Sequence, residues 1–176
     1  MNEQVETRVT LRERTGWRWL PLTAVIVVFD QITKAIIVDR FELYDTVRVL
    51  PVLDITRMHN TGAAFSFLAG QSGWQRWLFT LLALGVGAAI VVWLGKLKAS
   101  SQKLLACSLA LILGGAVGNL IDRVRFGYVV DFVYAHWNDA HFPAFNVADA
   151  SITVGAGLLL LDALLESRRA KRGAAA

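Results

Sequence analysis

GGAVGNLIDRVRFGYVVDFVYAHWNDAHFPAFNVADAS, residues 114–151, is the stretch that decides the fold of this chain. It begins at the end of one long apolar run and finishes at the start of another. Between the two runs the sequence places four aspartates, two asparagines and an arginine that stand out from apolar neighbours: Asp122, Asp131, Asp139, Asp149, Asn119, Asn146 and Arg123. Polar groups at the rim of a hydrocarbon layer are costly to keep there, so they indicate a functional site.

The composition indicates an integral membrane protein. The 176 residues are 55% hydrophobic and 18% charged, with a mean hydropathy of +0.48. A soluble domain of this size carries roughly 25% charged residues. The apolar excess is also gathered into long runs, whereas a soluble domain spreads it at helical or strand periods.

The sequence predicts one all-α membrane domain over residues 1–176, with four spans. These spans cover residues 17–38, 74–94, 104–121 and 145–165, each about the length that crosses a hydrocarbon core of about 30 Å. The first run is not a cleaved signal peptide, because Asp30 and Lys34 interrupt it and no A-x-A-like site follows. Residues 39–73 are rich in β-branched side chains and turn signals, which predicts a small extramembrane β-structure resting on the bilayer surface.

Charge patterning predicts the topology. Basic residues gather in the tails 1–16 and 166–176 and in the loop 96–103, so the positive-inside rule places these segments in the cytoplasm. Residues 39–73 and 122–144 then lie outside. The net charge of +4 is explained in this way, and no basic face indicates nucleic acid. In this topology nearly every polar residue in or beside a span falls at the outer face, which indicates a single site there.

Several candidate residues also have structural explanations. Asp30 and Lys34 share a helix face at i, i+4, as an ion pair that supports packing or as a contact for a substrate. Asn146 and Asp149 have the spacing of an N-cap and its acidic partner. Asn119 follows three glycines and suits a hydrogen bond to a neighbouring helix.

The remaining pair in this stretch is equally open. Asp122 and Arg123 suit an interfacial ion pair, or Arg123 clamps a carbonyl or phosphate of a substrate.

Other catalytic classes find little support. His59, His136 and His141 match no zinc-binding spacing, and Cys107 lies inside an apolar run without a nearby histidine. There is no G-x-S-x-G motif for a serine hydrolase. Paired aspartates need neither metal nor cofactor: held close at low dielectric, one keeps a proton while the other acts as a base towards water. From the residues alone, Asp122 ranks equal to Asp131 as a member of such a pair.

Five motifs, in order, resemble the lipoprotein signal peptidases, also called type II signal peptidases. They are DQITK (30–34), HNTGAAFSF (59–67), GGAVGNLIDR (114–123), VVDF (129–132) and FPAFNVADAS (142–151). The resemblance extends from Trp17 to about Leu165. It implies a bundle of four transmembrane helices with a small periplasmic β-cradle and a short amphipathic surface helix near the second span.

The resemblance also implies an activity and its residues. The expected enzyme is an aspartic endopeptidase of the bacterial inner membrane that removes the signal peptide from diacylglyceryl-modified prolipoproteins, cutting before the lipidated cysteine. Its catalytic aspartates fall on Asp131 and Asp149. Its substrate-binding or supporting residues fall on Asp30, Lys34, Asn60, Gly62, Asn119, Asp122, Arg123 and Asn146. We expect a monomer among membrane lipids, without a metal or other cofactor, with both termini cytoplasmic and the site near the periplasmic face.

Two other functions are alternatives. A proton-coupled transporter subunit uses intramembrane carboxylates as a relay, but such proteins carry polar residues through the full depth of the bundle and often two repeated halves. The inner halves of these spans are almost purely apolar and no repeat is visible. A non-catalytic lipid-binding membrane protein is the second alternative, and it predicts that Asp131→Asn leaves biological activity intact.

Overall fold

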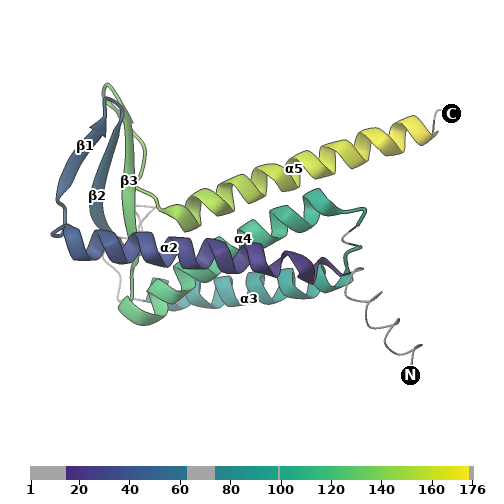
Figure 1. The fold of residues 1–176 in the computed structure, drawn as a ribbon, viewed down its shortest axis with the longest axis horizontal. Helices are drawn as coiled ribbons and strands as arrows, with labels where there is room; N and C mark the ends of the chain where they lie inside the picture. Colours follow the sequence, from purple (N-terminus) through teal and green to yellow (C-terminus); the bar gives the residue numbers. More distant parts are fainter. Residues whose placement is uncertain (1–14, 63–73, 99, 175–176) are drawn as a thin grey trace.

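The chain is described here from a computed structural model, which covers residues 15–62, 74–98 and 100–174. Within these ranges four helices are long and apolar enough to cross a membrane. They are α2 (Leu20–Arg40), which follows the short 3-10 helix η1 (Gly16–Trp19), α3 (Trp74–Lys96), α4 (Lys103–Phe126) and α5 (Val147–Ala174). Figure 1 shows these helices extending from one small sheet, with the C-terminal end of α5 at the far end of the molecule.

Helix α4 is the centre of the bundle. In its most apolar window 56% of residues are buried, compared with 17–22% in the other three spans. Its glycines make this possible: a Cβ on Gly114 would lie 2.8 Å from Cβ of Ile26 in α2. A Cβ on Gly118 would lie 2.6 Å from Oδ2 of Asp30. The GGAVG segment therefore serves close helix packing.

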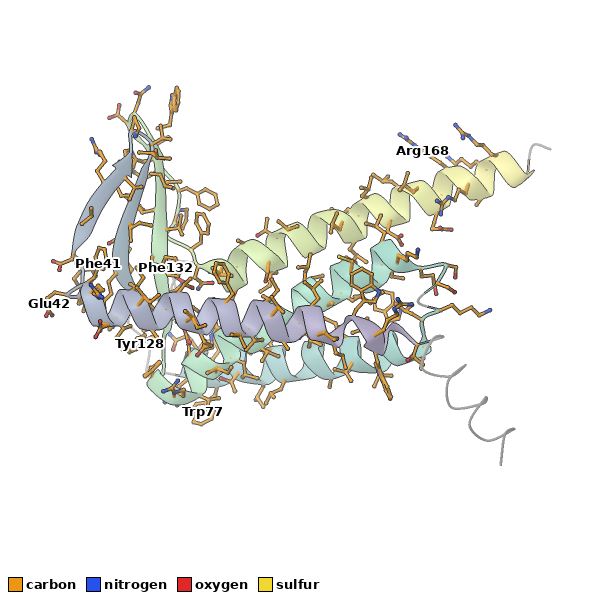
Figure 2. The ribbon with its side chains drawn as sticks, in the orientation of Figure 1. Phe41, Glu42, Trp77, Tyr128, Phe132 and Arg168 are labelled. Carbon is orange, nitrogen blue, oxygen red and sulfur yellow. The ribbon has the colours of Figure 1, made fainter. Side chains whose placement is uncertain are left out.

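The two ends of the bundle differ in chemistry. Towards the end that is distant from the sheet, α3 and α4 enclose an apolar core of seven buried residues: Ile90, Leu94, Leu97, Leu105, Ala106, Leu109 and Leu113. At the sheet end, buried Ile37, Val130 and Phe132 form a smaller cluster that joins α2 to the sheet. Figure 2 shows Phe41 and Phe132 at this junction and Arg168 at the opposite end of the molecule.

The sheet has four antiparallel strands in the order β1-β2-β3-β4. Strands β1 (Thr46–Leu50) and β2 (Leu53–Asn60) form the β-structure predicted within residues 39–73. Strands β3 (Val129–Trp137) and β4 (Ala140–His141) come from the segment that the sequence described only as an outer loop. The richness of VVDFVYAHW in β-branched and aromatic residues is the signal that indicates a strand there.

The helix bounds also differ from the predicted spans. Helix α4 continues to Phe126, with Gly127 in the left-handed conformation as its C-cap (φ +86°), so Asp122 and Arg123 lie on its last turns and not in a loop. Helix α5 begins at Val147, two residues after the predicted start of the fourth span. The surface helix expected near the second span stays a prediction, because residues 63–73, which lead into that span, lie outside the described residues.

Candidate active site

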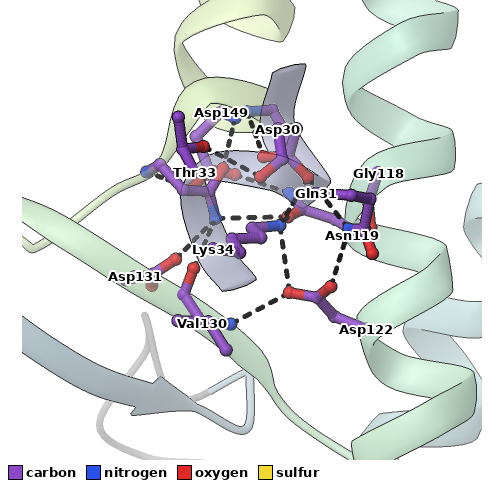
Figure 3. A network of polar contacts seen from close by, with 12 residues as sticks. Asp30, Gln31, Thr33, Lys34, Gly118, Asn119, Asp122, Val130, Asp131 and Asp149 are labelled. Atoms are coloured by element: carbon purple, nitrogen blue, oxygen red, sulfur yellow. Dashed lines mark hydrogen bonds and ion pairs between the residues drawn. The ribbon is translucent and has the colours of Figure 1, made fainter. Parts of the chain in front are cut away.

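The first part of the site is a buried ionic cluster around Lys34. The Lys34 ammonium lies 2.9 Å from Asp30 Oδ2 and 3.0 Å from Asp122 Oδ2, and it donates to Asn119 Oδ1 at 3.0 Å. An ammonium has three N–H donors, so these three acceptors match its capacity. The side chains of Lys34, Asp30 and Asp122 are at most 4% exposed. Figure 3 shows the cluster between α2 and α4.

Each carboxylate of this cluster also accepts a hydrogen bond from a backbone N–H, and in both cases the donor residue directly precedes an aspartate outside the cluster. Asp30 Oδ1 accepts from the N–H of Ala148 at 2.9 Å, in the first turn of α5. Asp122 Oδ2 accepts from the N–H of Val130 at 3.1 Å, in β3. Ala148 precedes Asp149 and Val130 precedes Asp131. The cluster therefore fixes the backbone beside both aspartates that the resemblance assigns to catalysis.

Gln31 connects the two carboxylates of the cluster. Its Nε2 donates to Asp122 Oδ1 at 2.9 Å, to Asp30 Oδ2 at 3.2 Å and to the carbonyl of Gly118 at 3.3 Å. The sequence interpretation did not select Gln31. The signal that selected Asp30 and Lys34, a polar residue within an apolar span, applies equally to Gln31.

Asn146 is the residue that joins the two candidate catalytic aspartates. Its Nδ2 donates to Asp131 Oδ1 at 2.7 Å, and its backbone N–H donates to Asp149 Oδ2 at 3.3 Å. Its Oδ1 accepts from the N–H of Asp149 at 2.9 Å, which completes a capping box at the start of α5. The helix cap and the site, which the sequence left as alternatives, are one arrangement.

Asp131 lies on β3 opposite Met58 of β2 and is 2% exposed. Its Oδ2 accepts from Asn60 Nδ2 at 2.9 Å. Burial, and then the nearby charge of Asp149, raise the pKa of Asp131 to about 7, although the hydrogen bonds from Asn60 and Asn146 oppose this shift. Near neutral pH this carboxyl therefore exchanges a proton readily.

Asp149 lies in the first turn of α5 and is half-buried. Its Oδ1 accepts from Asn119 Nδ2 at 2.7 Å, in addition to the bond from the backbone of Asn146. The N-terminus of a helix favours negative charge, because its first N–H groups have no partners within the helix. The described part of the chain shows no salt bridge from a lysine or arginine to Asp149 or Asp131.

Arg123 and Gly62 complete the predicted set. Arg123 donates to the carbonyl of Asn119 at 3.4 Å, and its guanidinium is close enough to Asp149 and Asp131 to interact with their charges. Gly62 has φ +96° and donates its N–H to Asn60 Oδ1 at 2.8 Å. The ion pair suggested between Asp122 and Arg123 is not the observed one, since Asp122 pairs with Lys34.

The structure thus brings all ten predicted residues into one connected set of polar contacts. The histidines lie elsewhere: His59 stacks on Tyr128 with ring centroids 3.7 Å apart, and His136 and His141 face each other across β3 and β4. Among the described residues, no group of three or more His, Cys, Asp or Glu side chains is placed to hold a metal ion. The chemistry available in this set is that of two neighbouring carboxyls.

Comparisons with known proteins show the family to which this chain belongs. Residues 22–165 match the family model described as signal peptidase (SPase) II. The chain belongs to the signal peptidase II family. It is 53% identical over 146 residues to the lipoprotein signal peptidase of Pseudomonas aeruginosa, covering 82% of this chain and 86% of the relative. It is 45% identical to that of Shewanella pealeana, covering 90% and 92%.

A solved structure supports the same assignment. A bacterial membrane enzyme determined by the in meso method superimposes with a TM-score of 0.76 at 32% identity, covering 88% of this chain and 93% of that one. The protein is therefore an aspartic-type signal peptidase II and a multi-pass bacterial membrane protein.

Proposed function

We propose that this signal peptidase II removes the signal peptide from diacylglyceryl-modified prolipoproteins by cutting before the lipidated cysteine, with Asp131 and Asp149 activating water. The lipoprotein signal peptidases among its relatives support the substrate class. The observation that carries the assignment of the dyad is Asn146, which contacts Asp131 through its side chain and Asp149 through its backbone. Two carboxyls joined by one buried residue lie within reach of a common substrate.

The surroundings of the two carboxyls favour different roles for them. Asp149, at a helix N-terminus, is the better placed of the two to be the anion that takes a proton from water. Asp131, with its pKa raised to about 7, is suited to carry a proton and to donate it towards the scissile carbonyl. Water then adds to the carbonyl carbon, and the tetrahedral intermediate collapses as the leaving amide nitrogen takes a proton.

The other site residues divide into support and substrate contact. Lys34, Asp30 and Asp122 hold the backbone on either side of the dyad, and their side chains, at most 4% exposed, are not open to a substrate. Asn60 and Asn119 each donate to one catalytic carboxylate. Arg123 makes only one long hydrogen bond that the structure records, which suits it to bind a carbonyl of the substrate.

The fold and charge pattern support a location for the reaction. The site lies where the sheet meets the helices, and the basic residues 168–172 lie at the other end of α5. The positive-inside rule then places the sheet as a periplasmic cradle, the site near the periplasmic face of the inner membrane and both termini in the cytoplasm. Since one chain supplies every residue of the candidate site, a monomer suffices.

The test is cleavage of a diacylglyceryl-modified prolipoprotein by the purified protein in detergent. Wild type, Asp131→Asn and Asp149→Asn are compared, with a chelator in one arm. We expect each substitution to lower the cleavage rate by about 10²–10⁴-fold, the usual contribution of general acid–base catalysis, and the chelator to have no effect. Cleavage that survives either substitution would exclude the dyad. Substrate binding without cleavage by the wild type would favour the non-catalytic alternative.

A further inference from the structure

Phe79 lies on α3, a helix that contributes none of the ten predicted site residues. Its ring nevertheless packs directly against Gly62. A Cβ built on Gly62 would lie 2.6 Å from Cε2 and 2.9 Å from Cδ2 of Phe79, well inside the closest approach of real side chains. The positive φ of Gly62 and this contact together require glycine at the turn that follows β2.

The same ring also contacts Arg123. The guanidinium carbon of Arg123 lies over the ring of Phe79, 5.4 Å from its centroid, which is within the range of a cation–π interaction. A single aromatic side chain therefore touches the turn at Gly62 and the arginine on the last turns of α4.

Two hydrogen bonds connect Gly62, which Phe79 contacts, to the proposed catalytic carboxyl of Asp131. The N–H of Gly62 donates to Asn60 Oδ1 at 2.8 Å, which fixes the orientation of the Asn60 amide. The Nδ2 of Asn60 then donates to Asp131 Oδ2 at 2.9 Å. The position of the turn therefore determines whether Asn60 reaches Asp131.

We infer that Phe79 is a positioning residue, which holds the Gly62 turn so that Asn60 donates to Asp131 and which keeps Arg123 beside the dyad. This inference rests on the proposed function of Asp131. It gives α3 a part in the reaction, although α3 supplies no polar group to the predicted site. Removing the ring would leave the turn and the guanidinium without their common support.

The experiment compares Phe79→Ala and Phe79→Tyr with Leu78→Ala in the cleavage assay. Leu78 lies next to Phe79 on α3 and is 45% exposed, so its truncation is a matched control for lost apolar volume. Because a misplacement of about 1 Å can cost about a hundredfold in rate, we expect Phe79→Ala to lower kcat/KM by about ten- to a hundredfold. Phe79→Tyr, which keeps the ring, and Leu78→Ala should cleave like wild type.

Two further readouts separate positioning from general damage. The hydrogen bond from Asn60 lowers the pKa of Asp131, so losing it should move the high-pH limb of the activity profile of Phe79→Ala to higher pH. In an Asn60→Ala background, Phe79→Ala should have less effect than in wild type, since only its contact with Arg123 is then left to lose. Wild-type activity of Phe79→Ala, an unmoved limb or a full additional loss beside Asn60→Ala would each overturn the inference.

Asp131→Asn, measured in parallel, keeps the two proposals distinguishable. An active Asp131→Asn enzyme would contradict the proposed dyad itself. An inactive Asp131→Asn enzyme beside a fully active Phe79→Ala enzyme would contradict only the role of Phe79.

Discussion

The two acidic centres at the sheet end of this protein lie side by side and differ in how their charges are balanced. Around Lys34, two buried carboxylates share one ammonium, and every strong donor has an acceptor. At Asp131 and Asp149, the observed partners are the amides of Asn60, Asn119 and Asn146. Both centres lie where α2, α4, α5 and the sheet meet (Figure 3).

The difference separates carboxylates that are balanced by a cation from the pair that we propose to be catalytic, whose partners are neutral amides. A cation stabilises the charged form of a neighbouring carboxylate, and Lys34 supplies one to both Asp30 and Asp122, which in turn accept from backbone N–H groups. An amide donor also favours the anion, but it brings no full charge. Asp131 is consequently left with a pKa of about 7, where a proton can be gained and lost during turnover.

The largest effect is expected when the cation of the first centre is removed. Lys34→Met would leave Asp30 and Asp122 buried without their shared partner. Breaking a buried ion pair from one side typically costs about 3–5 kcal/mol of the free energy of unfolding. Both backbone supports of the dyad depend on these carboxylates, so we also expect activity to be lost. Thermal unfolding in detergent measures the first effect and cleavage the second.

Arg40→Met is the matched control for this change. Arg40 pairs with Asp39 at 3.2 Å, but both side chains are about three-quarters exposed, so this ion pair should contribute little. Adding Asp30→Asn and Asp122→Asn to Lys34→Met should recover part of the stability, because neutral amides replace unpaired charges. A Lys34→Met protein that melts with the wild type would show that the cluster is not a support.

The next effect concerns the residue that joins the dyad. Asn146→Ala removes the cap of α5, at a cost of about 1–2 kcal/mol, together with the donor to Asp131. Asn146→Ser keeps an oxygen that can cap the helix and removes only the amide donor. We expect both to lower the rate about a hundredfold, while the serine variant stays close to wild type in thermal stability. Equal activity of the serine variant and the wild type would remove Asn146 from the mechanism.

A smaller effect is expected when pH is changed, since both stability and activity should vary gradually as Asp131 titrates. The pKa of Asp131 is raised from 3.8 to about 7, so the folded protein holds this proton more tightly than the unfolded chain does. Its contribution to stability is therefore present at low pH and is lost as pH rises from about 4 to about 7. Activity should fall about tenfold per pH unit well above pH 7, as the dyad loses its shared proton.

The pH dependence is measured in two ways. Cleavage rates between pH 5 and about 9 give the activity limb, and unfolding midpoints between about pH 4 and 8 give the stability. In Asp131→Asn the decline in stability between about pH 4 and 7 should be reduced, since the titrating group is absent. An unchanged decline would assign it to another residue.

The smallest effect is expected at Gln31. Gln31→Leu removes donors from Asp30 and Asp122, yet both carboxylates keep Lys34, so we expect a loss of about 1 kcal/mol in stability. Thr33→Val is the control, because within the described ranges Thr33 Oγ1 bonds only to carbonyls of its own helix. A loss at Gln31 as large as that of Lys34→Met would show that the glutamine is essential to the cluster.

Much of this arrangement was predictable from the sequence, because it depends on local signals. The four apolar runs predict the helices, and β-branched residues predict β1 and β2. Polar residues at the ends of the runs indicate one site at one end of the bundle. The choice of Asp131 over Asp122, by contrast, came from family resemblance, since both are single aspartates near the outer end of a span.

What could not be predicted depends on contacts between distant segments. Whether Asp122 faces Lys34 or Arg123 is decided by how α2 packs against the glycines of α4. Phe79 is one apolar residue among many on α3, and nothing in its neighbours along the chain indicates a contact with Gly62. Strand β3 is rich in β-branched and aromatic residues, but only its pairing with β2 brings Asn60 to Asp131.

The bond between Asp30 and the N–H of Ala148 joins residues 118 positions apart, in the first and the last of the four long helices. During synthesis the first of these helices leaves the ribosome well before the last. The hydrogen bond from Ala148 to Asp30 therefore cannot form until α5 has been made. A nascent or truncated chain that lacks α5 has neither Asp149 nor this bond. Under the proposed dyad, the chain is therefore competent for proteolysis only once α5 has been made.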